Sequence, residues 1–166
     1  MYYDNNTKRK NFASSPQQSS GNRKKEEREA PDAFLSDNAF KQEWITVGAD
    51  EGMITFADKA GKYMAPLHPN GDRECLSKAQ IRNVFGEIKR IQLKGIDKPE
   101  GRSAFLLLKP KVAYAEGRNR TKGLTLFKKI FDKGWQYAGK SQATYNNFCA
   151  LLEAILAYHK AYGGKD

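Results

Sequence analysis

The sequence has few of the side chains that enzymes most often use as nucleophiles, bases or metal ligands. Its 166 residues include two cysteines, Cys75 and Cys149, and two histidines, His68 and His159. These four residues show neither the spacing of a metal site nor that of a disulfide framework. We interpret the cysteines as buried thiols of a protein from a reducing compartment, and His159 as a histidine of the helical core or of a helix end.

Acidic clusters and phosphate-binding loops are lacking as well. Single carboxylates on different predicted helices, mostly accompanied by Lys or Arg, are interpreted as charge partners: Glu87, Glu116, Asp132 and Glu153. The glycines fit neither common pattern of a phosphate-binding loop. We therefore expect a protein that is not an enzyme and that needs no metal ion or other cofactor.

Long apolar runs are absent too. The sequence has no stretch of about 18 apolar residues that could span a bilayer, and its first residues lack the apolar segment of a secretory signal. We expect a soluble, cytoplasmic protein with no membrane partner.

Basic residues are present in excess, and they are unevenly distributed. The formal net charge of the chain is +10. Residues 78–133 carry fifteen Lys/Arg and five Asp/Glu, a net charge of +10, whereas residues 1–33 carry seven and five, a net charge of +2. Such a concentration of cations predicts a polyanionic partner, nucleic acid before membrane.

The composition changes near residue 33. Residues 1–33 are polar and charged and have almost no aliphatic side chains, which predicts a disordered tail. From there to residue 166 apolar residues recur at helical spacing, and no alternating stretch is long enough to predict a strand. We predict one all-α domain over residues 34–166, a compact bundle of about five helices.

One helix has a well-marked start at Ser77. Ser77 and Gln80 have the form of a capping box, and a stripe of apolar residues follows: Ile81, Val84, Phe85, Ile88 and Ile91. Lys78, Arg82 and Lys89 fall within about 40° of one another on a flank beside this stripe. They could follow a phosphate backbone. An ordinary solvated helix face explains them equally well, and the neighbouring basic segments favour the first interpretation.

The stretch LLLKPKVAYAEGRNR, residues 106–120, places a proline inside a segment that turns from apolar to basic. A helix from about Ser103 to Ala115 would bury an apolar set: Phe105, Leu106, Leu108, Val112 and Ala113. Pro110 must then either kink this helix or break it, because proline lacks an amide hydrogen and clashes with the preceding turn.

If the helix continues past the proline, Lys111, Tyr114 and Arg118 lie on the same side of it. Gly117 would end the helix and leave Arg118, Arg120 and Lys122 on a basic connecting loop. Tyr114 is the aromatic residue that we select as a candidate for stacking on a nucleic-acid base.

The last two predicted helices supply most of the core. Leu124, Phe127, Ile130 and Phe131 share one face of the first. The second, from about Gln142 to Tyr162 with Ser141 as a possible N-cap, is predicted as the central helix.

Three stretches together resemble one family: SKAQIRNVFGEIKRI (77–91), LLLKPKVAYAEGR (106–118) and EAILAYHKAY (153–162). In this order and spacing, over about residues 40–162, they are similar to the helical small subunit of the type III-A CRISPR effector, the Csm complex. The family's basic positions fall on five residues of this chain: Arg82, Lys89, Lys109, Lys111 and Arg118. The family's kinked helix also implies that Pro110 lies inside one continuous, bent helix.

The resemblance implies a non-catalytic protein that is present in several copies and forms the inner filament of a ribonucleoprotein for antiviral defence. Its partners would be guide RNA and target RNA, the large signature subunit, the backbone subunits and further copies of itself. Together with the residues selected on charge, the candidate RNA-binding residues are Lys78, Arg82, Lys89, Lys109, Lys111, Tyr114, Arg118, Arg120 and Lys122.

Two other functions fit the composition. A free-standing, sequence-nonspecific helical nucleic-acid-binding protein would use the same basic surface outside any complex. A structural interaction module would place its Lys and Arg side chains against acidic patches of a partner protein. The set of three motifs favours the complex subunit.

Overall fold

The computed structural model describes residues 27–67 and 72–164, and within these ranges the protein is all-α, as predicted. Its helices are α1 (Pro31–Asp37), α2 (Glu43–Thr46), α3 (Glu51–Met64), α4 (Lys78–Lys94), α5 (Pro99–Arg118), α6 (Lys122–Ala138) and α7 (Gln142–Ala161). The first two are short, and the other five are 14 to 20 residues long. The predicted bundle of about five helices is confirmed.

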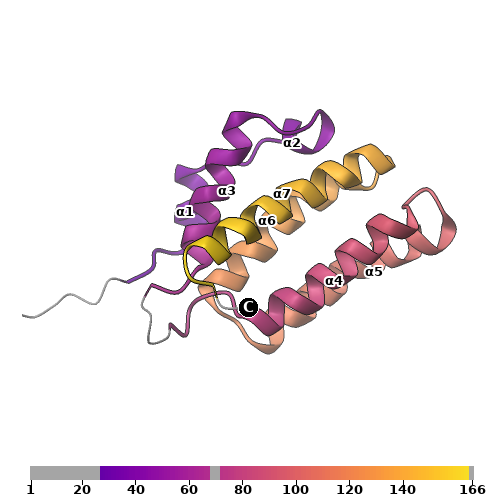
Figure 1. Ribbon diagram of the computed structural model, residues 1–166. Coiled ribbons are helices and arrows are strands. Elements are labelled where there is room, and N and C mark those ends of the chain that lie inside the picture. The colour runs from indigo at the N-terminus through magenta and orange to yellow at the C-terminus, as the bar shows by residue number, and fades with distance from the viewer. Residues whose placement is uncertain (1–26, 68–71, 165–166) are drawn as a thin grey trace, which may run out of the picture.

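The helices form three layers, with α6 and α7 in the middle (Figure 1). The hairpin of α4 and α5 lies on one side of this pair, and α1, α2 and α3 cover the other. The middle helix α7 contacts α2, α3, α4 and α6. Its fully buried residues include Tyr145, Phe148, Cys149, Leu152 and Ile155, so the prediction that it is the central core helix is confirmed.

The backbones of α3 and α7 approach each other closely at Gly61. A Cβ atom on Gly61 would lie 2.6 Å from Cβ of Tyr158 and 2.7 Å from the carbonyl oxygen of Ile155. No side chain fits at this position, and the absence of one lets the two helices pack at short distance.

The folded part of the chain begins before the predicted boundary at residue 34. Arg28 is buried, forms an ion pair with Asp72 at 2.9 Å and donates a hydrogen bond to the carbonyl oxygen of Ala65 at 2.6 Å. Pro31 then begins α1. Residues 27–33 therefore belong to the folded structure, and the rest of the predicted tail, residues 1–26, lies outside the described residues.

Helix α4 begins where the capping box predicts. The Gln80 side chain accepts a hydrogen bond from the amide of Ser77 at 3.0 Å. Val84, Ile88 and Ile91 are buried and Phe85 is half-buried, which confirms the apolar stripe for these positions. The side chain of Ile81 lies outside the described residues.

Helix α5 is continuous and contains Pro110, as the resemblance implied. Proline leaves the carbonyl group of Leu106 without its helical partner. Both residues are exposed, so water can satisfy this group and the helix continues. The helix starts earlier than predicted, at Pro99 rather than near Ser103, because a proline at the first helical position needs no hydrogen-bond acceptor.

Two residues of α5 that we predicted to be buried are exposed. The buried side of the helix consists of Gly101, Phe105, Leu108, Val112 and Glu116. Leu106 and Ala113 each follow one of these residues directly, so they point about 100° away from the buried side. The prediction was therefore wrong for Leu106 and Ala113.

No helix in the described ranges is both long and apolar enough to cross a membrane.

Candidate nucleic-acid interface

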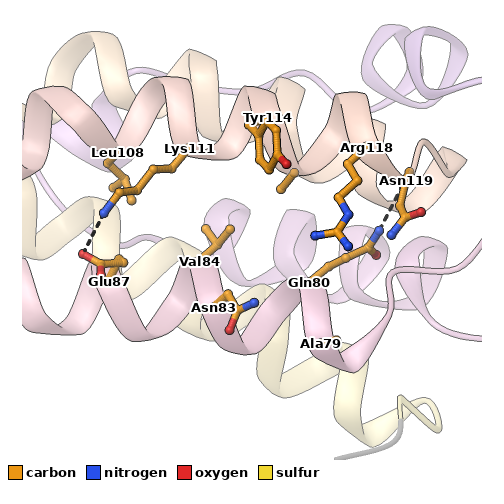
Figure 2. A pocket seen from close by; sticks show the side chains of 11 residues that line it. Ala79, Gln80, Asn83, Val84, Glu87, Leu108, Lys111, Tyr114, Arg118 and Asn119 are labelled. Atoms are coloured by element: carbon orange, nitrogen blue, oxygen red, sulfur yellow. Dashed lines mark hydrogen bonds and ion pairs between the residues drawn. The ribbon is translucent and has the colours of Figure 1, made fainter.

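A groove of about 560 Å³ runs between α4 and α5 (Figure 2). Its walls come from the two antiparallel helices of the hairpin, and its floor includes the apolar residues Val84 and Leu108. The other residues that line it are Ala79, Gln80, Asn83, Glu87, Lys111, Tyr114, Ala115, Arg118 and Asn119. The groove thus has an apolar floor and polar or charged walls.

Lys111, Tyr114 and Arg118 form a row along the α5 wall (Figure 2). They lie three and four residues apart on one continuous helix, and this spacing aligns side chains on a single face. The prediction that they share a side is confirmed. Tyr114 is 70% exposed, so its ring is available to a partner. Within the described ranges no carboxylate pairs with Arg118.

The α4 wall carries one carboxylate, that of Glu87. Its Oε2 atom lies 3.5 Å from Nζ of Lys111 across the groove and 2.6 Å from Nη2 of Arg90 on its own helix. The hydrogen bond from Arg90 lowers the pKa of Glu87, and the charge of Lys111 adds to this effect. Glu87 is therefore ionised at neutral pH and offsets part of the positive charge of the groove.

A hydrogen bond joins the two walls at the other end of the groove. Gln80 donates from Nε2 to the carbonyl oxygen of Asn119 at 3.0 Å, while its Oε1 atom caps α4. This double use of one side chain fixes the start of α4 against the end of α5. Arg118 therefore stands beside a fixed end of the groove (Figure 2).

The three cations predicted on one flank of α4 do not join the groove as a set. Lys89 hydrogen-bonds to Glu153 of α7, which raises the pKa of Lys89, and it also donates to Oε1 of Gln92 at 3.0 Å. Arg82 is exposed and lines no part of the groove. The side chain of Lys78 lies outside the described residues.

Lys109 and Lys111 lie on different sides of α5. Residues two positions apart in a helix point about 200° away from each other. Lys109 therefore faces α6, where its Nζ atom lies 4.7 Å from the centre of the Trp135 ring. Of the predicted cations of α5, the structure therefore brings only Lys111 and Arg118 into the groove.

The predicted basic loop after Gly117 is shorter than expected. Arg118 is the last residue of α5 and Lys122 is the first of α6. Of the three predicted loop cations, only Arg120 lies in the connection, residues 119–121. Gly117 continues the helix, and the amide of Asn119 still bonds to Ala115. The link can be short because Thr121 immediately caps the next helix by accepting from the amide of Leu124.

Arg120 and Lys122 have protein partners. Arg120 pairs with Glu116 at 2.9 Å, although its side chain is 75% exposed. Lys122 donates to the carbonyl oxygen of Arg28 at 2.6 Å and lies 3.7 Å from a carboxylate oxygen of Glu27. Lys122 therefore helps to hold the segment before α1, a role that the sequence did not indicate.

Sequence reasoning missed the α4 wall of the groove. Gln80, Asn83 and Glu87 lie three and four residues apart, which is the same signal that identified the row on α5. From the sequence, Gln80 is recognisable only as a cap residue of α4 and Glu87 only as a charge partner. Their role as the facing wall follows from the pairing of two helices.

Histidines and cysteines form no metal site in the described residues. No group of three or more His, Cys, Asp or Glu side chains there could hold a metal ion. His159 is buried, with Nε2 3.2 Å from the carbonyl oxygen of Leu76, and burial lowers its pKa. Cys149 is buried and Cys75 half-buried, so the interpretation as core residues is confirmed for His159 and Cys149. His68 lies outside the described residues.

Fold and groove together define a class of protein: a small, basic, all-α bundle with a cationic groove on its surface. Comparison with protein families then shows which family this is. The family model described as Csm2 Type III-A matches residues 51–165. The chain therefore belongs to this family and is a small subunit of a type III-A CRISPR-Cas complex, as the resemblance predicted. No curated protein and no solved structure matches the chain.

Proposed function

We propose that this protein is a non-catalytic RNA-binding subunit of the Csm complex and that the α4–α5 groove contacts the RNA backbone. The RNA would be the duplex of guide and target. Several copies would stack as the inner filament, next to the large signature subunit and the backbone subunits, in the cytoplasm. The family membership supports the complex, and the groove supports the RNA contact.

The observation that carries the proposal is the row of Lys111, Tyr114 and Arg118 in one open groove. Lys111 and Arg118 lie seven residues apart, about 10 Å along the helix axis, with the exposed Tyr114 ring between them. Two cations and an aromatic ring in line are the elements that proteins use to follow a nucleic-acid backbone.

This arrangement suits sequence-tolerant binding. Where a guide RNA pairs with its target, base pairing reads the sequence and the protein needs to recognise only shape and backbone charge. We therefore expect similar affinity for duplexes of different sequence.

The proposal is tested with the full chain and a guide–target RNA duplex of about 20 base pairs. The variant Lys111→Ala/Arg118→Ala should bind more weakly to every sequence, with the slope of log affinity against log salt reduced in magnitude by about 1.4 to 1.8. The matched control is Lys41→Ala/Lys59→Ala, which removes two exposed cations outside the groove. Equal slopes for wild type and the groove variant would refute the groove as the RNA contact.

The partners are tested separately. A tagged full chain is recovered from its host with and without ribonuclease, and the retained RNA and proteins are identified. We expect guide RNAs together with a large signature subunit and backbone subunits. Heterogeneous RNA or DNA without those proteins would instead support a free-standing nucleic-acid-binding protein.

A further inference from the structure

A second row of cations lies on α5, on the side opposite the groove. Arg102 and Lys109 are seven residues apart and therefore share one side of the helix. This side faces α6, whereas Lys111 and Arg118 face α4. Both Arg102 and Lys109 are exposed.

Aromatic rings connect these cations. The rings of Phe105 in α5 and Trp135 in α6 are stacked, with centres 5.0 Å apart and planes 7° apart. Lys109 lies over the Trp135 ring at 4.7 Å, and the Arg102 guanidinium lies 5.6 Å from the centre of the Phe105 ring. Each ring of the stacked pair thus carries a cation.

The row continues beyond the end of α6. Arg102 donates a hydrogen bond to the carbonyl oxygen of Gly139, and the next residue, Lys140, lies 5.9 Å from the centre of the Tyr137 ring. These contacts join the exposed or half-buried residues of one face, which we call the α5–α6 face, around the buried ring of Phe105: Arg102, Lys109, Trp135, Tyr137 and Lys140.

No carboxylate of the described residues forms an ion pair with the cations of this face. Among the described residues, the ion pairs of the chain include neither Arg102, Lys109 nor Lys140. In the groove, by contrast, Glu87 offsets Lys111. The α5–α6 face therefore presents three positive charges that are unpaired among the described residues, and the aromatic contacts restrict where these charges lie.

We propose that the α5–α6 face is a second contact surface for an RNA backbone, separate from the groove. This inference rests on the proposed function and adds a second site to it. Three cations in a row that form no ion pair with a described carboxylate are the electrostatic footprint of a polyanion site. An acidic protein is the less suitable partner, because lysine is depleted in protein–protein interfaces and two of the three cations are lysines.

The α4–α5 groove and the α5–α6 face lie on opposite sides of α5, so one subunit can join two stretches of RNA backbone. A single copy contacts one stretch of backbone through the α4–α5 groove and another through the α5–α6 face. The two sites therefore contribute independently to RNA affinity, because mutations at distant sites without shared partners are additive.

The test compares two charge-removing variants of the full chain on the same RNA duplex and on a single-stranded RNA. The face variant is Arg102→Gln/Lys109→Gln/Lys140→Gln, and the groove variant is Lys111→Gln/Arg118→Gln. We expect the face variant to reduce the magnitude of the salt slope by about 2.1 to 2.7, and the combined variant to show the sum of both reductions. Thermal unfolding of each variant checks that the fold is retained.

Lysine acetylation of the wild-type chain provides a second readout that needs no substitution. Bound RNA should protect Lys109 and Lys140 from acetylation and leave the control residue Lys59 reactive. The inference is wrong if the face variant binds RNA like wild type and Lys109 and Lys140 stay reactive in the presence of RNA. The proposed function stands in that case if the groove variant loses affinity. If the groove variant also binds like wild type, the proposed function fails as well.

Discussion

Lys111 and Glu87 face each other across the α4–α5 groove, with Nζ and Oε2 3.5 Å apart. Arg90, which lies on α4 like Glu87, binds the same carboxylate with its Nη2 atom 2.6 Å from Oε2. A phosphate that binds Lys111 must therefore compete with Glu87. The Glu87 carboxylate therefore competes with RNA phosphate for Lys111, and removing its charge should increase the affinity for RNA.

Replacing Glu87 with Gln should strengthen RNA binding. The change removes the negative charge opposite Lys111 and keeps the size of the side chain. Exposed ion pairs of this kind contribute about 0.2 to 1 kcal/mol, so we expect an increase in affinity of up to about fivefold at low salt. Fluorescence anisotropy with a labelled RNA duplex measures it. Glu43→Gln removes an exposed charge outside the groove and is the control; equal effects of both variants would contradict a local competition.

Replacing Tyr114 with Ala should weaken RNA binding without affecting stability. The side chain is 70% exposed, so its removal leaves no cavity in the core. An unpaired base of a single-stranded RNA that stacks on the ring would contribute about 1 to 3 kcal/mol, whereas Tyr114→Phe keeps the ring and should bind like wild type. The measurements are RNA affinity and thermal unfolding of both variants. A loss of affinity in Tyr114→Phe equal to that in Tyr114→Ala would assign the contact to the hydroxyl group instead.

Two Gly→Ala substitutions should have opposite effects on stability. At Gly61 the new methyl group would lie within 2.7 Å of the α7 backbone, so α3 and α7 must separate and we expect a loss of about 1 to 3 kcal/mol. At Gly86, within α4, a Cβ atom meets nothing within 4 Å, and the restriction of the unfolded chain should add about 0.4 to 1 kcal/mol. Denaturant unfolding of both variants measures these effects. A stabilised Gly61→Ala variant would show that the α3–α7 contact is looser than described.

The stability of the protein should fall as the pH decreases from about 7.5 to 5.5, because of His159. Burial lowers the pKa of His159 below its ordinary value of 6.5, and the nearby charge of Arg28 acts in the same direction. The unfolded chain therefore binds more protons than the folded chain in this range. The stability that neutral His159 contributes is complete at pH values well above 6.5 and is lost progressively as the pH falls through and below 6.5. The pKa of Asp72 is also lowered, but from 3.8, so it contributes only at more acidic pH.

The measurement is the free energy of unfolding across this pH range for wild type and His159→Gln. The variant should be less stable at neutral pH and should depend less on pH. An unchanged pH dependence in His159→Gln would assign the effect to another group.

Local periodicity predicted the parts of this molecule that depend on a single helix. The row of Lys111, Tyr114 and Arg118 follows from the helical repeat alone, once the helix passes Pro110. The start of α4 follows from the side-chain chemistry of Ser77 and Gln80. These features need no knowledge of which helices pack together.

The partners of the other cations depend on contacts between distant segments. Lys89 pairs with Glu153, 64 residues away, and Lys122 bonds to the carbonyl group of Arg28, 94 residues away. Both were selected as RNA-binding candidates because the sequence shows their charge and not their partner. The burial of Arg28 was missed for the same reason, since its ion pair with Asp72 joins segments far apart in the chain.

The anchoring of Arg28 joins segments that are far apart in the sequence. Lys122, the first residue of α6, donates to the carbonyl group of Arg28, and the Arg28 guanidinium bonds to Ala65 at the end of α3 and pairs with Asp72. One residue ahead of α1 therefore ties the outer layer of the bundle to its middle layer.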